Sequence, residues 1–209
     1  MGATVIAAAS SQEKVDFCIS KGAHKGLVYP ENPLSREQQK VFSDQIKELG
    51  GGGVDVIYDG VGGDYAEPAV RALNWEGRFL VIGFPAGIPK LPLNLTLLKS
   101  CQIVGVFWGA FVARDPKGHA ENLADLFRLY QEGKIRPHVS NRYPLERAAD
   151  AIKELSERRA KGKVVITIEQ NDTDFVANIR SEKASENSAK SIASGLGLLL
   201  QAAAAAAKG

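Results

Sequence analysis

The chain has 209 residues, of which 24% are charged and 44% hydrophobic, and its formal net charge is +2. This length suits one domain, or one domain with a tail, and it is enough to bury a sizeable core. A near-neutral charge without a basic run excludes nucleic acid as an expected partner. Cys18 and Cys101 have neither metal nor disulfide spacing, which indicates free thiols in a reducing compartment.

The ends of the chain carry no recognisable targeting or membrane signal. Residues 1–6 have no basic region before a short apolar run, unlike a signal peptide. The apolar stretch 196–207 is shorter than the ~20 residues of a membrane-spanning helix. We therefore expect no membrane segment and a cytoplasmic location; a mitochondrial location would require a targeting segment upstream.

Short apolar runs alternate with helical patterns along the first four fifths of the chain. The runs rich in β-branched residues predict strands at 4–8, 26–29, 54–58, 77–83, 102–107 and 163–168. Amphipathic periodicity and cap residues such as Ser11 predict helices at 12–21, 35–49, 64–74, 92–99, 119–133 and 145–161.

This alternation predicts an α/β fold with a doubly wound parallel sheet over residues 3–168. Strands that are apolar on both faces indicate a sheet covered by helices on both sides. The composition changes at about residue 169, where a polar stretch is followed by an alanine-rich end. The sequence therefore predicts a separate tail over 169–209, disordered in its polar part and with some helix propensity at its end.

Two hydroxyls and a lysine follow the first predicted strand. Ser10, Ser11 and Lys14 stand where an NAD site typically has an acidic residue for the ribose hydroxyls. Hydroxyls, an ammonium group and helix N-terminal amides instead suit a 2′-phosphate. The alternative is a serine cap beside a solvated lysine.

Glycines follow three later strands, where ligands bind in doubly wound sheets. Asp59, Gly60 and Val61 begin a glycine-rich turn, but Tyr65 fills the position of the third glycine of a dinucleotide fingerprint. The segments 83–87 and 105–109 mix glycine with aromatic residues, including Phe84 and Phe107. Tight turns and core packing are the alternative explanations.

No set of residues with catalytic or metal-binding spacing accompanies these turns. His24, His119 and His138 stand apart, and no histidine or cysteine cluster has zinc spacing. The sequence therefore assigns no catalytic residue and no metal ligand.

Taken in order, these segments resemble the medium-chain dehydrogenases and reductases of the quinone oxidoreductase (zeta-crystallin-like) type, over about residues 3–168. The resemblance is carried by the segments 8–14, 21–24, 54–63, 75–84, 97–99, 105–109, 133–137 and 162–165. It implies a Rossmann-like domain and zinc-independent hydride transfer from NADPH to a small-molecule quinone or enone.

The resemblance also implies roles for individual residues. Ser10, Ser11 and Lys14 would face the 2′-phosphate, and Tyr29 would lie beside the adenosine half. Asp59, Gly60 and Val61 would border the cofactor; Gly83, Phe84 and Phe107 would lie near its nicotinamide end. The edge strand 102–107 would pair across a homodimer.

The chain departs from the family pattern at its beginning. Nothing corresponds to the family's small β-rich domain, nor to the first, central strand of the nucleotide-binding sheet with its glycine-rich turn. The strand near Ala3 should then pair with the strand at Val54 or be poorly ordered. We expect a truncated portion that is inactive by itself. The alternatives are a non-catalytic module that pairs with a full-length homologue, and a methyltransferase-like α/β domain.

Overall fold

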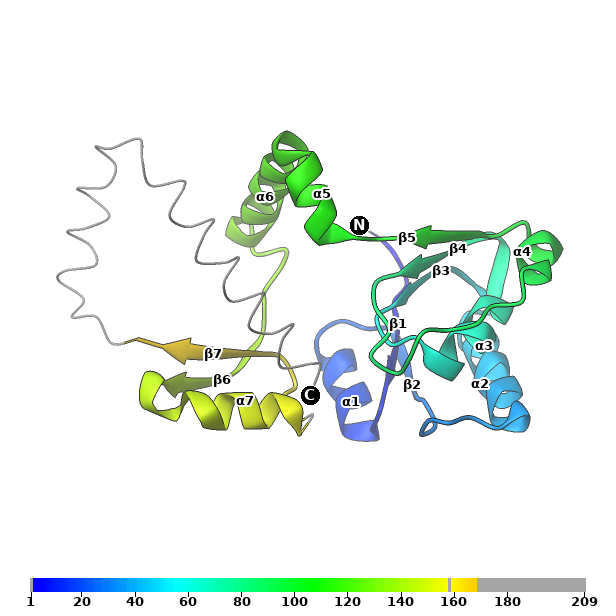
Figure 1. Cartoon of the computed structure of the whole chain (residues 1–209), viewed down its shortest axis with the longest axis horizontal. Coiled ribbons are helices and arrows are strands. Elements are labelled where there is room, and N and C mark those ends of the chain that lie inside the picture. Colours follow the sequence, from blue (N-terminus) through cyan, green and yellow to red (C-terminus); the bar gives the residue numbers. More distant parts are fainter. Residues whose placement is uncertain (1, 158, 169–209) are drawn as a thin grey trace. The chain divides into compact units, whose positions relative to one another are not determined.

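The structure is a computed structural model that describes residues 2–157 and 159–168. The chain divides into two compact units, Met1–Pro137 and His138–Gly209, which are described separately below (Figure 1). Every paired strand runs parallel to its neighbour, and helices alternate with the strands, which confirms the α/β class. The predicted tail, 169–209, lies outside the described residues, and the predicted domain boundary stays a prediction.

The first unit begins with a βαβ segment of β1 (Ile6–Ala9), α1 (Gln12–Ser20) and β2 (Lys25–Val28). The two strands pair in parallel, and α1 packs on both. Ser11 caps α1 as the sequence predicts, because its Oγ accepts a hydrogen bond from the Lys14 amide at 3.3 Å. Gly26 lets the helix approach closely, since a Cβ there would lie 2.5 Å from Cγ1 of Val15.

A three-stranded sheet follows in the order β3-β4-β5. Its strands are β3 (Val54–Asp59), β4 (Leu73–Val81) and β5 (Gln102–Gly105). The helix α2 (Arg36–Leu49) leads into it and begins with a capping box between Ser35 and Gln38. The connections between strands hold η1 (Gly63–Tyr65), α3 (Ala66–Arg71) and α4 (Asn94–Lys99).

Only one face of this sheet is well covered. On that face, Phe79 is fully buried in a cluster with Val70 of α3 and Leu95 of α4. On the opposite face of β3, Val56 is 51% exposed and Tyr58 is 73% exposed. The sequence predicted cover on both faces, as parallel sheets normally have. The α/β class holds, but no described helix shields these two side chains, so the cover of the second face is incomplete at β3.

The two sheets of the first unit share a core but not a hydrogen-bonded edge. Ile6 of β1 and Val54 of β3 pack on one cluster, which contains Leu27, Phe42 and Ile46. Within residues 2–157, however, β1 pairs with β2 and not with β3. The sequence left pairing with β3 or poor order as alternatives, and neither is observed. One edge of β1 and one edge of β3 therefore carry backbone groups without a strand partner in the described chain.

The first unit ends with α5 (Trp108–Arg114) and α6 (Pro116–Gln131), which pack against each other. The Trp108 and His119 rings meet edge to face, with centroids 5.4 Å apart. The sequence predicted α6 but no helix at 108–114. Within the described residues, no helix is long and apolar enough to span a membrane. The cytoplasmic location stays a prediction.

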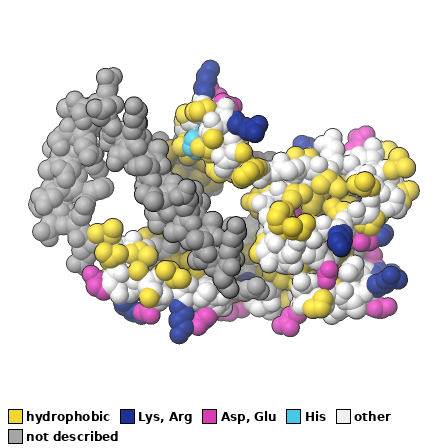
Figure 2. Space-filling model, viewed as in Figure 1, with side chains coloured by type: hydrophobic (Ala, Val, Ile, Leu, Met, Phe, Trp, Pro, Cys, Tyr) yellow, Lys and Arg dark blue, Asp and Glu magenta, His cyan; other side chains and the backbone are white. Residues whose placement is uncertain are grey.

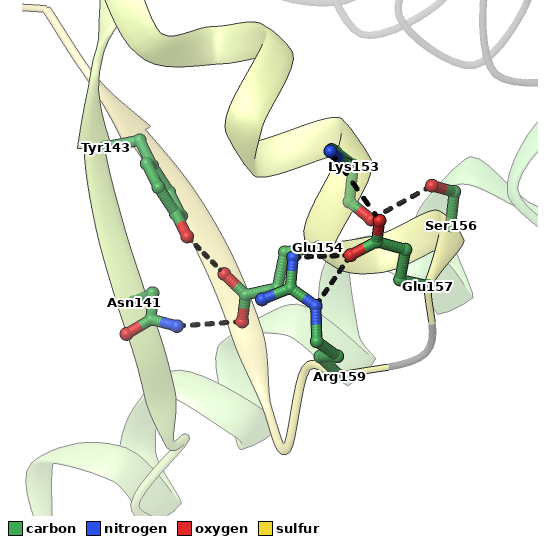
Figure 3. A network of polar contacts seen from close by, with 7 residues as sticks. All are labelled: Asn141, Tyr143, Lys153, Glu154, Ser156, Glu157 and Arg159. Atoms are coloured by element: carbon green, nitrogen blue, oxygen red, sulfur yellow. Dashed lines mark hydrogen bonds and ion pairs between the residues drawn. The ribbon is translucent and has the colours of Figure 1, made fainter.

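The second unit is a smaller βαβ segment. It consists of β6 (Val139–Pro144), η2 (Leu145–Arg147), α7 (Ala148–Ser156) and β7 (Lys163–Thr167), with β6 and β7 parallel. Figure 3 shows how side chains of β6 point at α7: the Tyr143 hydroxyl donates to Glu154 Oε2 at 2.6 Å, and Asn141 Nδ2 donates to Oε1 at 2.7 Å. Glu154 is only 3% exposed, so both of its oxygens are satisfied within the fold.

The Glu154 carboxylate gives the second unit an expected acid sensitivity. The hydrogen bond from Tyr143 is the main cause that lowers the pKa of Glu154, with a further contribution from Asn141. A lowered pKa means that the stabilisation is present above the ordinary glutamate pKa of about 4.3 and is lost as the pH falls through the folded value. Glu154→Gln should therefore lower the melting temperature near neutral pH and flatten its decline in acid.

Thermal unfolding followed between about pH 3 and pH 7 checks this expectation. Glu157→Gln is the matched control, because Glu157 lies on the exposed side of the same segment, where it pairs with Arg159 (Figure 3). An acid profile that is identical in wild type and Glu154→Gln would contradict the assigned role of the carboxylate.

Candidate functional site

The carboxyl ends of β1 and β2 bring together four residues that the sequence singled out. Lys14 Nζ donates to Ser10 Oγ at 3.3 Å, and Ser11 Oγ caps the Lys14 amide. The backbone amide of Tyr29 donates to the carbonyl of Ala9 at 3.0 Å, which places Tyr29 beside the end of β1. The four residues thus form one group, called here the Lys14 cluster: Ser10, Ser11, Lys14 and Tyr29.

The Lys14 cluster has the chemistry of an anion site. It combines an ammonium group, the Ser10 hydroxyl and the positively polarised N-terminus of α1. Glu13 lies in the same turn, so the site carries one carboxylate as well. The serine-cap part of the predicted alternative is observed, because the Ser11 hydroxyl caps the helix; Ser10 is exposed and Lys14 is half-buried.

A second group lies on the turn after β3. Asp59 is 9% exposed, and its Oδ1 accepts from the amides of Val61 at 2.9 Å and Gly62 at 3.0 Å. The Val61 side chain packs on the core cluster that contains Phe42 and Ile46 of α2. Only the backbone of Val61 is therefore available to a ligand at the end of β3. Asp59 and Val61 therefore have a structural role in the turn.

Two backbone hydrogen bonds, called here the clasp, join this turn to the loop after β4. The Gly63 amide donates to the carbonyl of Gly87 at 2.7 Å, and the Ala86 amide donates to the carbonyl of Val61 at 2.9 Å. The two backbone hydrogen bonds hold the loops after neighbouring strands at a fixed separation. Sequence reasoning did not find this clasp, because it joins backbone groups whose partners depend on the fold.

The glycines at these strand ends fall into two kinds. Gly62 and Gly63 have positive φ values of 71° and 60°, and a Cβ on either would collide with the loop 84–87. For these two, the predicted alternative of a tight turn is sufficient.

Gly60, Gly83 and Gly105 are of the other kind. None of them has a positive φ, and a Cβ on any of them would meet nothing within 4 Å. They stand at the carboxyl ends of β3, β4 and β5, three adjacent parallel strands. We call them the open glycines. Neither backbone strain nor close packing requires glycine at these three positions. What they share is that they leave the carboxyl ends of the strands free of side chains, so that a flat or extended molecule can approach the backbone.

Two exposed aromatic side chains flank the open glycines. Phe84 follows Gly83 and is 47% exposed, and Phe107 follows β5 and is 78% exposed. Figure 2 shows apolar side chains spread over the surface of this unit. Large exposed aromatic rings next to strand ends that carry no side chain can stack on a planar ligand.

The Lys14 cluster and the open glycines lie at the same end of the first unit. The Tyr65 hydroxyl, from the segment after β3, donates to the Pro30 carbonyl after β2 at 2.7 Å. Asp64 Oδ2 also accepts from the Leu34 amide at 3.0 Å. Because the two loops directly follow β2 and β3, these bonds bring the carboxyl ends of the two strands together. All ten residues proposed from the sequence thus fall in two groups at one end of one unit.

A separate hollow of about 300 Å³ lies beside the Gly63 turn. Its walls are Gln39, Gly63, Asp64, Glu67, Ala86, Gly87, Ile88, Pro89 and Lys90. None of the ten proposed residues lines it, and Glu67 is engaged in an ion pair with Arg71 at 2.6 Å. We therefore place the candidate site at the strand ends rather than in this hollow.

Metal ligands are not gathered anywhere in the described part of the chain. Over 2–157 and 159–168, no three His, Cys, Asp or Glu side chains lie close enough to hold one ion. The residues present there do not fit a zinc centre.

The chain has clear relatives among known proteins. The sequence profile described as "Zinc-binding dehydrogenase" matches residues 34–166. Quinone oxidoreductase-like protein 2 of Bos taurus is 35% identical over 167 residues, which are 79% of this chain and 46% of that protein.

Solved structures agree with the sequence comparison. A probable oxidoreductase from Mycobacterium abscessus is 31% identical, with a TM-score of 0.65 over 80% of this chain and 47% of that one. The mycobacterial protein Rv1454c, solved in complex with NADPH, is 29% identical, with a TM-score of 0.68 over 79% of this chain and 49% of that one.

The chain spans about half the length of the curated relatives that it matches. The matched region includes the strands and loops that carry the open glycines. The family profile covers more than half of the chain, and the fold and relatives agree with it. The chain belongs to the zinc-binding dehydrogenase family, among the medium-chain dehydrogenases and reductases of the quinone oxidoreductase type.

Proposed function

We propose that this chain is the NADPH-binding part of a quinone-reductase-like oxidoreductase. The observation that carries the proposal is the row of open glycines on adjacent strands, beside the Lys14 cluster. A dinucleotide needs an uncluttered strand edge and an anion site at one end, and both features lie at the same end of this unit. The names of the relatives, which include quinone oxidoreductases and a 2-haloacrylate reductase, support hydride transfer to a quinone or enone.

In this proposal each group of residues has a separate task. Lys14 and Ser10 bind the 2′-phosphate, the Ser11-capped helix turns its amides toward that phosphate, and Tyr29 lies beside the adenosine. Asp59 and Val61 hold the turn that presents Gly60 to the cofactor. Gly83, Phe84 and Phe107 border the nicotinamide end and shield it from water. NADPH, when bound, supplies the hydride, and this chain's residues orient it.

We further propose that the chain does not turn over substrate by itself. One face of β3 is exposed at Val56 and Tyr58, and β1 and β3 each have an unpaired edge in the described chain. A sheet that is exposed in this way does not exclude water from the place where hydride transfer would occur. NADPH-dependent reduction of a simple quinone by the purified chain would refute this part of the proposal while leaving cofactor binding intact.

Lys14→Ala should weaken NADPH binding roughly tenfold and leave NADH binding unchanged, because only NADPH carries the 2′-phosphate that the ammonium group faces. Titration of both nucleotides by calorimetry measures the two affinities. Lys21→Ala is the control. Lys21 lies at the opposite, carboxyl end of the same helix, where its Nζ is over the Phe17 ring, 5.2 Å from the ring centroid. An equal loss for both nucleotides would show that Lys14 does not read the 2′-phosphate.

We also propose a homodimer formed through the edge strand β5. The strand has a partner only on its β4 side in the described chain, and Ile103 on it is 38% exposed. Ile103→Lys would place like charges near the two-fold axis and should convert the dimer to monomer in sedimentation experiments. Ile88→Lys, at a 79% exposed site outside the strand, should leave the dimer intact. A wild-type chain that sediments as a monomer would refute the dimer.

The same open edges favour one second candidate, a non-catalytic module that pairs with a full-length homologue. Recovery of a longer relative with this chain, together with absence of intrinsic reductase activity, would favour this candidate over a homodimer.

A further inference from the structure

Tyr65 links the two loops that frame the candidate site. It occupies the place of the third fingerprint glycine, at the end of η1, and is only 8% exposed. Its hydroxyl donates to the Pro30 carbonyl at 2.7 Å, across 35 residues of sequence. A buried phenol that reaches a backbone carbonyl of another loop fixes the position of that loop.

The loop that Tyr65 holds is the one that carries Tyr29. The two rings have centroids 5.0 Å apart and are tilted by 56°, and the hydroxyl of Tyr65 bonds to the residue directly after Tyr29. On its other side, Tyr29 is bonded through its amide to Ala9, at the end of β1. Tyr29 is therefore held between Ala9, at the end of β1, and Tyr65.

We propose that Tyr65 is a positioning residue for the adenosine half of the cofactor. It holds the Tyr29 ring in the orientation in which an adenine can lie against it, through the ring contact and the bond to Pro30. The inference rests on the proposed function, since it requires that Tyr29 faces the adenosine. It adds a residue that touches neither the phosphate nor the adenine and acts only through Tyr29.

A purely structural role for Tyr65 makes a different prediction. The ring also packs edge to face on Phe42, with centroids 6.0 Å apart, and belongs to the core cluster of α2. If Tyr65 served the core alone, Tyr65→Phe, which keeps the ring and removes only the hydroxyl, would change stability without changing affinity for the adenosine half.

The test uses the purified chain and adenosine 2′,5′-bisphosphate, which contains the adenosine half without the nicotinamide. Calorimetric titration of Tyr65→Phe should show roughly three- to tenfold weaker binding than wild type, which is as much as one neutral hydrogen bond can contribute when its loss frees the Tyr29 ring in the unbound chain. Tyr143→Phe is the matched control. It also removes a hydroxyl hydrogen bond, of 2.6 Å, but one in the second unit, and it should bind like wild type.

A double-mutant cycle with Tyr29→Ala separates positioning from general loosening. If Tyr65 acts through Tyr29, Tyr65→Phe should cause no further loss of affinity in the Tyr29→Ala background. An equal loss in both backgrounds, or wild-type affinity of the single Tyr65→Phe variant, overturns this inference alone. Failure of the wild-type chain to bind the bisphosphate overturns both this inference and the proposed function.

Discussion

Replacing Gly83 by valine is expected to weaken NADPH binding roughly ten- to a hundredfold without lowering the melting temperature. A side chain inserted into an occupied contact costs about 1–3 kcal/mol. In the free chain the first carbon of the new side chain meets nothing, because a Cβ at Gly83 has no neighbour within 4 Å, and the backbone is unstrained because φ is not positive. The cost should therefore appear only when the cofactor is bound.

Two further substitutions make the Gly83 result interpretable. Gly105→Val should behave in the same way, since it changes another open glycine on the neighbouring strand. Gly51→Ala is the control, because Gly51 lies in the turn before the amino end of β3, where an added Cβ also meets nothing within 4 Å, and it should leave NADPH affinity unchanged. Unaltered NADPH affinity in both valine variants would mean that the open glycines do not face the cofactor.

Gly62→Ala should have the opposite signature and destabilise the fold itself. Gly62 has φ 71°, and a Cβ there would lie 2.6 Å from the Phe84 Cβ and 2.8 Å from the Gly87 carbonyl oxygen. The strained backbone and the forced displacement of the clasped loop together should cost about 2–4 kcal/mol. Urea unfolding of the variant measures this loss.

Gly51→Ala isolates the backbone part of that loss. Gly51 has φ 72°, nearly the same as Gly62, but a Cβ there meets nothing within 4 Å. It should cost only about 1–2 kcal/mol, the penalty of a left-handed residue alone. Equal losses for the two variants would contradict the steric role of the clasp between the turn and the loop 84–87.

The strands and helices of the first unit were largely predictable from the sequence. The predicted strands at 54–58 and 102–107 correspond to β3 and β5, and the apolar stripe at 35–49 corresponds to α2. These elements follow from continuous apolar runs or from amphipathic periodicity with a cap, which are local signals.

Elements that depend on distant partners were missed. The strand β6 was not predicted because Asn141 and Tyr143 are polar, and their hydrogen-bond partner, Glu154, lies on α7. The helix predicted to reach Asn74 ends at Arg71, because Leu73 pairs with Val54 on the neighbouring strand and Glu76 has a positive φ of 60°. Pairing of this kind overrides local propensity.

The sequence was enough to place the candidate site at the strand ends, but not to assign a role to each of its residues. The position after each strand is enough to select Ser10, Gly60 and Gly83. Which glycine supports a turn and which leaves space depends on the loop that faces it, as the contrast between Gly62 and Gly83 demonstrates. Tyr65 was recognised as the departure from the fingerprint, but its bond to Pro30 has no sequence signal.

Thermal unfolding of the purified chain with increasing NADPH or NADH tests the central claim most directly. A ligand that binds the folded state raises the melting temperature, and at a given concentration a tighter ligand raises it more. The proposal predicts a cooperative transition that rises with NADPH and much less with NADH. A transition that responds to neither nucleotide, or equally to both, would contradict the assignment of an NADPH site to this chain.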